Sequence, residues 1–370
     1  MSDAVVLAVD GGNSKTDLAL VRADGQVLAL VRGPLSSPHH LGLDGALDVL
    51  QRLLDQASRD AGRARNGTVA TIAQLLMAGV DFPSEEEELR AAVAGRGWAE
   101  RTRVGNDTFA VLRAGTERGW GVAVVCGAGI NCVGVSPDGR HARFPALGSI
   151  TGDWGGGWDV GLAAVSAAAR SEDGRGPKTT LEQAVPSYFG LETPTALAEA
   201  IHRQRIPQRR IIELPPVVLA EAEHDAVAAE IVARLAAEVA TLAHVALRRL
   251  ELEDEPTELL LGGGLLQSAD GKLAAAIEAE LREVAPSLRV HKARSAPIVG
   301  SALLGLDELG AREEAQERLR RELGAAVDAL ERPFSDPEGP DRSFQTDVRA
   351  QPARPDSGTA SGAFGGGTDG

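Results

Sequence analysis

Short apolar runs and glycine loops alternate at the start of the chain. The run VVLAV (5–9) ends at Asp10, a Gly11-Gly12 loop follows, and apolar runs resume at 17–21 and 27–31 on either side of the turn RADGQ. Apolar runs of this length, separated by glycine or Asp-Gly turns, are typical of β-strands joined in hairpins. The pattern predicts strand, loop, strand, turn and strand.

The segments that follow alternate between helical and strand patterns. Apolar residues from Leu43 to Ala61 recur at helical spacing. The run TIAQLLMAGV (71–80) predicts a buried strand, and Ser84 with Glu87 predicts a capping box at the start of a helix. RTRVGND predicts a short strand that ends in a loop, and a further helix is expected from Thr108.

The opening pattern recurs at 121–144, where GVAVVCGAGINCVGVSPDGRHARF again has two apolar runs around a glycine loop and an Asp-Gly turn. Two copies predict a duplicated α/β fold whose glycine loops face each other. Helical stretches are expected at 216–251, a strand with a glycine cluster at 257–268, and helices at 298–309 and 311–333. The segment 334–370 has almost no apolar residues, and we expect a disordered tail.

Length and composition narrow the class of protein. The 370 residues exceed a usual single core, which favours two domains, and the net charge of −15 argues against a nucleic-acid or anionic-membrane surface. Cys126 and Cys132 are too few for a disulfide framework or a zinc knuckle, and we expect them to be small buried hydrophobes. No basic leader is present, and no apolar run approaches the roughly 18 residues of a membrane helix, so we expect a cytoplasmic protein.

The first glycine loop invites comparison with a P-loop. A P-loop has a glycine directly before Lys-Thr and a helix directly after it, whereas here Ser14 precedes Lys15 and a strand follows. The backbone N–H groups of residues 11–16 can instead face phosphate oxygens, with Lys15 as a point charge and Asp10 near Mg²⁺. Taken alone, this loop is explained equally well as an ordinary hairpin turn with solvated charges.

Three other stretches carry candidate chemistry. In GND (105–107), Asp107 is either the N-cap of the next helix or a general base that faces a hydroxyl. In LGSITGDWGGGWDVG (147–161), Asp153 and the indoles of Trp154 and Trp158 suit a sugar, although the indoles can instead pack between domains. The loop GPLSSPHHLG (33–42) offers hydroxyl and imidazole groups to a sugar or is an ordinary polar loop.

Together these motifs resemble the acetate and sugar kinase/Hsp70/actin superfamily. VDGGNSKTDLALV is similar to its first phosphate motif, VVCGAGINCVGV to its second and ELLLGGGLL to its adenosine motif, and SAPIVGSALLGL (295–306) resembles its connecting helix. Within the superfamily the chain resembles the BadF/BadG/BcrA/BcrD ATPase family, especially its N-acetylglucosamine kinase branch. The resemblance implies a two-domain actin-like ATPase fold, a duplicated ribonuclease H-like α/β unit, with a nucleotide cleft between residues 1–115 and 116–310. The second domain would carry a helical insertion, and its last helix (298–309) would cross back to the first.

The resemblance also implies a function and a set of site residues. ATP and Mg²⁺ would be the cofactors, and the γ-phosphate would pass to a hydroxyl, usually the 6-OH, of an amino sugar such as N-acetylglucosamine. The partners would be a small-molecule sugar and no nucleic acid or membrane, with room for a homodimer. Asp107 matches the catalytic base and Asp10 the acidic residue near the metal. The nucleotide positions are Gly11, Gly12, Asn13, Ser14, Lys15, Thr16, Gly127, Ala128, Gly129, Gly262, Gly263 and Gly264. The sugar positions are Ser37, His39, Asn106, Asp107, Asn131, Gly148 and Asp153.

Some residues depart from the family pattern, and other functions compete. Ser37 stands where amino-sugar kinases usually have Asn, Ala128 replaces Thr or Ser, and Trp154 replaces a common Glu, so glucosamine and glucose are alternative acceptors. An ATP-driven activator of a radical dehydratase would bridge a [4Fe–4S] cluster through cysteines such as Cys126 and Cys132. A sugar-responsive repressor would need a basic helix-turn-helix ahead of the first strand.

Overall fold

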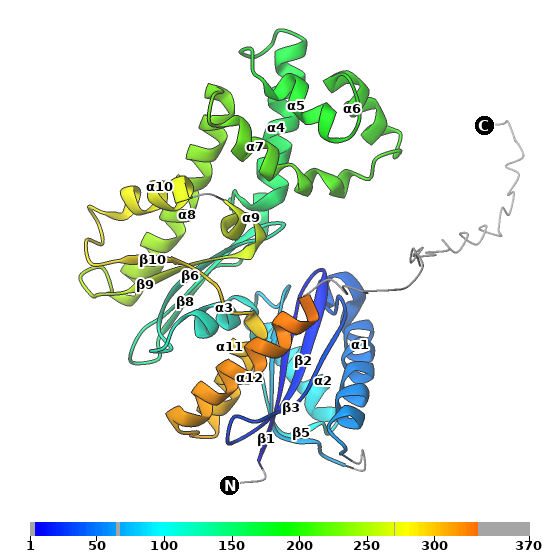
Figure 1. Ribbon diagram of the computed structural model, residues 1–370, viewed down its shortest axis with the longest axis vertical. Coiled ribbons are helices and arrows are strands. Elements are labelled where there is room, and N and C mark those ends of the chain that lie inside the picture. Colours follow the sequence, from blue (N-terminus) through cyan, green and yellow to red (C-terminus); the bar gives the residue numbers. More distant parts are fainter. Residues whose placement is uncertain (1–3, 64–66, 270, 332–370) are drawn as a thin grey trace, which may run out of the picture. The chain divides into compact units, whose positions relative to one another are not determined.

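The computed structural model describes residues 4–63, 67–269 and 271–331, and the strands of these residues form two sheets (Figure 1). The first sheet, in the order β3-β2-β1-β4-β5, contains β1 (Val5–Gly11), β2 (Lys15–Arg22), β3 (Val27–Pro34), β4 (Ala70–Met77) and β5 (Ala99–Asn106). β1, β2 and β3 pair antiparallel, whereas β4 pairs parallel with both β1 and β5. The predicted strand–loop–strand–turn–strand unit is confirmed.

The second sheet repeats this topology. Its order is β10-β9-β6-β7-β8, with β6 (Gly121–Cys126), β7 (Ile130–Val135), β8 (His141–Arg143), β9 (Glu258–Gly262) and β10 (Arg289–Lys292). β6, β7 and β8 pair antiparallel and come first in the chain. β9 then pairs parallel with β6, and β10 pairs parallel with β9. The duplication predicted from the recurring glycine-loop pattern is therefore confirmed as two mixed sheets with one strand order.

Both faces of β1 are buried, which explains its unbroken apolar run. Val5, Leu7 and Val9 belong to one apolar cluster, whereas the alternating residues Val6 and Ala8 belong to another. The first cluster includes side chains of α1 (Pro38–Asp60) and α2 (Pro83–Gly95), and the second includes side chains of α11 (Pro297–Glu308) and α12 (Glu313–Glu331). The first sheet is thus covered by helices from both ends of the described chain.

Two helix starts differ from the sequence prediction. α1 begins at Pro38 instead of Leu43, with a kink at Gly42 (φ 69°), because proline is preorganised for the first helical position. α2 begins at Pro83, and the predicted Ser84–Glu87 capping box is wrong. The Glu85 carboxylate instead accepts hydrogen bonds from the backbone N–H groups of Asp81 and Phe82, at 2.8 and 2.9 Å.

Most of the chain between β8 and β9 is helical (Figure 1). α3 (Thr108–Gly115) connects the two sheets, and a helical insertion separates β8 from β9. The helices of this half are α4 (Gly156–Glu172), α5 (Leu181–Tyr188), α6 (Pro194–His202), α7 (Pro215–Glu221), α8 (Ala226–Leu250), α9 (Gly263–Ser268) and α10 (Gly271–Leu281). None of the helices in the described ranges is long and apolar enough to cross a membrane.

α12 is fixed to the rest of the fold by polar as well as apolar contacts. Its Arg320 guanidinium donates to the carbonyl oxygens of Ala114 and Thr116, at 2.6 and 2.7 Å, at the C-terminal end of α3. Its Glu322 carboxylate accepts from the N–H of Val27 at the start of β3, at 3.0 Å. The charged helix expected at 311–333 is therefore a structural cover of the first sheet. The tail expected at 334–370 lies outside the described residues.

Candidate active site

A pocket of about 470 Å³ lies where the loops after β4 and β5 meet the glycine loop between β6 and β7. The carboxyl ends of parallel β4 and β5 are in register, with Met77 opposite Asn106, so the residues that follow both strands reach one edge of the sheet. The pocket is lined by Asn13, His39, Ala78, Gly79, Asp81, Asn106, Asp107, Thr108, Val125, Gly127, Ala128, Gly129, Ile130, Asn131, Ala146, Leu147 and Ile150. The lining includes predicted site residues from the first half of the chain, such as Asp107, and from the second half, such as Asn131.

Asp107 lines this pocket, and its side chain does not serve as a cap of α3. It occupies the N-cap position, but its carboxylate accepts no capping hydrogen bond. The Oδ1 atom of Asn106 instead accepts from the backbone N–H and the hydroxyl of Thr108, at 3.0 and 2.6 Å. Because the neighbouring amide satisfies the helix start, the Asp107 carboxylate remains available to a ligand.

The Asn106 side chain links the loop after β4 to the start of α3 through hydrogen bonds. Its side chain is buried, and its Nδ2 donates to the Asp81 carboxylate at 2.8 Å and to the carbonyl of Val80 at 3.3 Å. Its Oδ1 also lies 3.4 Å from Nδ2 of Asn131. The predicted sugar positions Asn106 and Asn131 therefore line the pocket, but the Asn106 amide is used by the protein itself.

Three carboxyl groups near the pocket have raised pKa values. Burial raises the pKa of Asp107 to about 6, against the opposing effect of nearby backbone N–H groups. Burial, and then the carboxylates of Asp107 and Glu85, raise the pKa of Asp81 to about 6. Burial, and then the carboxylates of Asp107 and Asp17, raise the pKa of Asp10 to about 8. Such crowding of carboxylates is typical of sites that bind a cation or transfer a proton.

The second glycine loop is shaped by the start of α4. The carbonyls of Gly127 and Ala128 accept from the N–H groups of Gly157 and Trp158, at 2.8 and 2.9 Å. Gly156 has a φ of +73°, and a Cβ there would lie 2.3 Å from the carbonyl oxygen of Gly129. Gly156 is therefore needed for the close packing of α4 against the loop that lines the pocket.

The tryptophans of this segment pack away from the pocket. Neither Trp154 nor Trp158 is among the lining residues of the 470 Å³ pocket, and both pack against the apolar core of the second half. The Arg234 guanidinium of α8 lies 4.0 Å from the centre of the Trp154 ring. The two indoles therefore pack within the second half and not between domains, as the alternative to sugar contact had expected.

Several predicted positions do not line this pocket. Lys15 Nζ lies 3.2 Å from the Glu331 carboxylate, the buried Thr16 hydroxyl donates to Ser36 Oγ at 2.7 Å, and the Ser37 side chain is fully buried. Asp153 accepts a hydrogen bond from the Thr151 hydroxyl. The predicted positions outside the lining are Asp10, Gly11, Gly12, Ser14, Lys15, Thr16, Ser37, Gly148, Asp153, Gly262, Gly263 and Gly264. Within the described residues, no group of three His, Cys, Asp or Glu side chains could hold a metal ion.

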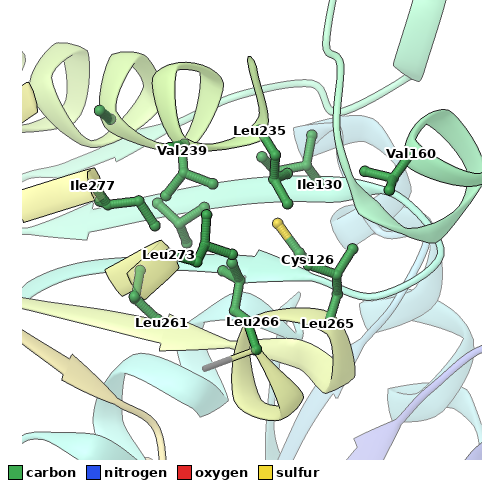
Figure 2. Close-up of a cluster of buried hydrophobic side chains, with 14 of the residues drawn as sticks. Cys126, Ile130, Val160, Leu235, Val239, Leu261, Leu265, Leu266, Leu273 and Ile277 are labelled. Atoms are coloured by element: carbon green, nitrogen blue, oxygen red, sulfur yellow. The ribbon is translucent and has the colours of Figure 1, made fainter. Parts of the chain in front are cut away.

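The two cysteines are core residues. Cys126 and Cys132 are free and buried, and the Cys126 sulfur lies among aliphatic side chains such as Ile130, Leu235 and Leu265 (Figure 2). Burial raises the pKa of both thiols, that of Cys126 to about 12. They are therefore the small buried hydrophobes that the sequence indicates, and neither thiol is accessible to a partner.

Asp81 is a lining residue that the sequence reasoning missed. It follows β4 as Asp107 follows β5, and these strands are parallel neighbours. The signal was available, because carboxylates that follow neighbouring parallel strands gather at one sheet edge. In the sequence, Asp81 stands in the short link between the strand predicted at 71–80 and the helix expected from Ser84.

Comparisons with known proteins find a family model, curated relatives and solved structures that are similar to this chain. The model of the BadF/BadG/BcrA/BcrD ATPase family matches residues 7–305. An N-acetylmuramic acid/N-acetylglucosamine kinase of Clostridium acetobutylicum is 29% identical over 71% of this chain and 86% of that protein. An N-acetyl-D-glucosamine kinase of Dictyostelium discoideum is 25% identical over 83% and 99%. A crystal structure from Chromobacterium violaceum, provisionally named an N-acetylglucosamine kinase, superposes with a TM-score of 0.65 at 24% identity, over 82% of this chain and all of that chain.

Proposed function

We propose that this chain, which belongs to the BadF/BadG/BcrA/BcrD ATPase family, is an ATP-dependent sugar kinase that phosphorylates a hydroxyl of an amino sugar. The observation that carries the proposal is the Asp107 carboxylate, which is free of helix capping and lines a pocket with the glycine loop 127–129. The kinase names of both curated relatives support it. N-acetylglucosamine with its 6-OH as acceptor is the specific substrate that we propose.

In this mechanism Asp107 is the general base. The sugar hydroxyl loses its proton to the Asp107 carboxylate while its oxygen forms a bond to the γ-phosphorus of ATP, and the bond from that phosphorus to the β–γ bridging oxygen breaks to release ADP. Proton removal of this kind needs a positioned carboxylate with a pKa not far below the working pH, and burial raises the pKa of Asp107 to about 6. Backbone N–H groups of the glycine loops would face the transferring phosphoryl group, where fixed dipoles stabilise developing charge.

We propose that Asp10 is the protein carboxylate that would lie near a divalent cation, because the Asp17 carboxylate beside it is already bonded to Arg32. The Asp10 carboxylate is crowded by those of Asp107 and Asp17, which a cation would relieve, and carboxylate oxygens are the ligands that Mg²⁺ prefers. Asp10 would hold Mg²⁺ together with phosphate oxygens and water, and the bound ion would neutralise charge on the phosphates. Gly262 to Gly264 would lie beside the nucleoside.

The predicted domain boundary between residues 115 and 116 is part of the proposal. The first sheet ends at Asn106 and the second begins at Gly121, and each sheet has the same strand order. This repetition supports two actin-like halves that bind ATP between them. An activator of a radical dehydratase would need cysteines that can reach an iron–sulfur cluster shared between subunits. Cys126 and Cys132 are both buried, which argues against this alternative.

Release of ADP on a panel of sugars tests the proposed function. We expect N-acetylglucosamine to stimulate ADP release well above the rate without sugar, and more than glucosamine, N-acetylmannosamine or glucose. Mass spectrometry of the product should show a sugar monophosphate. If no sugar stimulates ATP turnover, the kinase function is wrong.

The Asp10→Asn variant tests the proposed cation site. The pKa of Asp10 is about 8 in the folded chain and near 4 in the unfolded chain, so the Asp10 carboxyl group binds a proton more tightly when the chain is folded. The contribution of the protonated Asp10 carboxyl group to the free energy of unfolding is complete below the pKa of the unfolded chain, near 4, and is lost as the pH rises through 8. In cation-free buffer at pH 8.5 we therefore expect the variant to melt a few degrees above the wild type. Mg²⁺ should raise the thermal midpoint of the wild type and leave the variant unchanged; equal responses would remove Asp10 from cation binding.

A further inference from the structure

The backbone N–H of Thr108, at the start of α3, has two side-chain acceptors close to it. Asn106 Oδ1 accepts from this N–H at 3.0 Å, in a turn of the Asx type. Burial raises the pKa of the Asp107 carboxylate to about 6, and the same N–H lies close enough to oppose that rise. Two neighbouring side chains therefore compete for one helix donor, and Asn106 holds it.

The backbone of Asp107 agrees with this division. A residue whose own side chain caps a helix typically has an extended backbone. Asp107 instead has helical dihedral angles, φ −62° and ψ −22°, and its side chain accepts no capping hydrogen bond. Its carbonyl oxygen already accepts from the N–H of Ala110 at 3.0 Å. The helix therefore starts with the Asp107 side chain left out of the cap.

The contacts of Asn106 require an amide at this position. Its Nδ2 faces acceptors, the Asp81 carboxylate at 2.8 Å and the Val80 carbonyl at 3.3 Å. Its Oδ1 faces donors, the N–H and the hydroxyl of Thr108, at 3.0 and 2.6 Å. The side chain is 3% exposed, so turning it would break several buried hydrogen bonds. The oxygen of Asn106 is thus fixed on the helix donor.

We propose that Asn106 is a positioning residue for Asp107, because its amide oxygen occupies the Thr108 N–H and so leaves the Asp107 carboxylate to the pocket. This inference rests on the proposed kinase function, in which Asp107 is the base. It gives Asn106 a role other than the sugar contact that the family resemblance implies. Without the amide, the Asp107 carboxylate, itself a favoured helix cap, would take the freed N–H and be withheld from the sugar hydroxyl.

Asn106→Ala and Asn106→Ser form a matched pair of variants. Both lose the hydrogen bonds of Nδ2 to Asp81 and Val80. Serine alone retains an oxygen that can accept from the N–H two residues further on, as hydroxyls do in turns of this kind. A difference between the two variants therefore reports the occupation of the Thr108 N–H and not the link to the loop after β4.

The pH profile of sugar phosphorylation is the first readout. In Asn106→Ala we expect kcat/KM to fall about tenfold, the preference that a cap gives to the capped conformation. Its rise with pH should move from about 6 to about 5 or below, because an N–H bonded to a carboxylate favours the ionised form. Asn106→Ser should recover most of the loss and keep the rise near pH 6. The titratable groups nearby, Asp10, Asp81 and His39, are the same in both variants.

Carbon-13 NMR of the Asp107 carboxyl group, recorded without nucleotide or sugar, tests the positioning apart from catalysis. The signal is assigned by its loss in Asp107→Asn. We expect a pKa near 6 in the wild type and in Asn106→Ser, and a lower one in Asn106→Ala. If Asn106→Ala does not fold, Asn106→Val carries the same prediction, because valine is favoured in strands and also offers no acceptor.

Two results would overturn the inference. One is an Asp107 pKa and a pH profile that stay unchanged in Asn106→Ala. The other is an equal loss of kcat/KM in the alanine and serine variants with the rise still at pH 6, which would indicate that Asn106 contacts the sugar directly. If the NMR pKa shifts as expected but no sugar is phosphorylated by the wild type, the kinase function is wrong and the positioning of Asp107 stands.

Discussion

Asp107→Asn folds and binds ATP as the wild type does, but phosphorylates sugar about 10²–10⁴ times more slowly, the usual contribution of a general base. The reason lies in the geometry of the loop after β5. Asn106 rather than Asp107 satisfies the start of α3, so the substitution removes a proton acceptor without removing a helix cap. Turnover by mass spectrometry and ATP binding by calorimetry measure the two expectations.

The pH profile gives a second readout of the same residue. Because the carboxylate must be ionised to act, kcat/KM of the wild type should rise with pH through about 6 and then level off. Without burial this rise would lie near pH 4, and in Asp107→Asn it should disappear. Asp60→Asn, at the exposed end of α1, is the matched control and should retain wild-type activity. Near-normal turnover in Asp107→Asn would remove Asp107 from the role of base.

Gly300→Ala destabilises the fold by about 3 kcal/mol or more, since overpacking here involves backbone atoms. Gly300 lies in α11 where this helix crosses α3. A Cβ at Gly300 would lie 1.9 Å from the carbonyl oxygen of Ala110 and 2.8 Å from the amide nitrogen of Ala114. Neither atom can move without shifting α3, which follows directly after Asp107. Denaturant unfolding measures the loss.

Gly324→Ala is the matched control, and its effect should have the opposite sign. Gly324 lies in the interior of α12, and nothing lies within 4 Å of a Cβ built there. Alanine should therefore stabilise this helix by about 0.5–1 kcal/mol. If both variants change the free energy of unfolding equally, close packing of α11 on α3 is not the reason for glycine at position 300.

Much of the fold was predictable because it depends on neighbouring residues. The alternation of apolar runs with glycine and Asp-Gly turns predicts hairpins, and its recurrence at 121–144 predicts the second sheet. Helix starts were less predictable. Pro38 precedes the start expected from apolar spacing, and Pro83 precedes the start expected from the Ser84–Glu87 capping box, since proline favours the first helical turn in both places.

The candidate site was predictable in part. Asp107 could be singled out because it follows a strand and precedes a helix, but its two roles could not be separated locally. Which role applies depends on Asn106, because its side chain accepts the capping hydrogen bond at the start of α3. That side chain is fixed by hydrogen bonds to Asp81 and Asn131, which are 25 positions away on either side in the sequence. Asp81 was missed although it follows one predicted strand as Asp107 follows the next, and the register of β4 with β5 brings both residues to one edge of the sheet.

The sequence by itself determined the two glycine-loop hairpins, the apolar strands and the small buried cysteines, because each follows from periodicity and turn chemistry within a few residues. Tertiary structure alone decided that Arg143 pairs with Glu86 and donates to the Asp81 carbonyl, and that Trp154 packs against Arg234. It also decided that Lys15 pairs with Glu331, at the far end of the described chain. These pairings join residues far apart in the chain, and burial and charge select them only when the sheets and helices have come together.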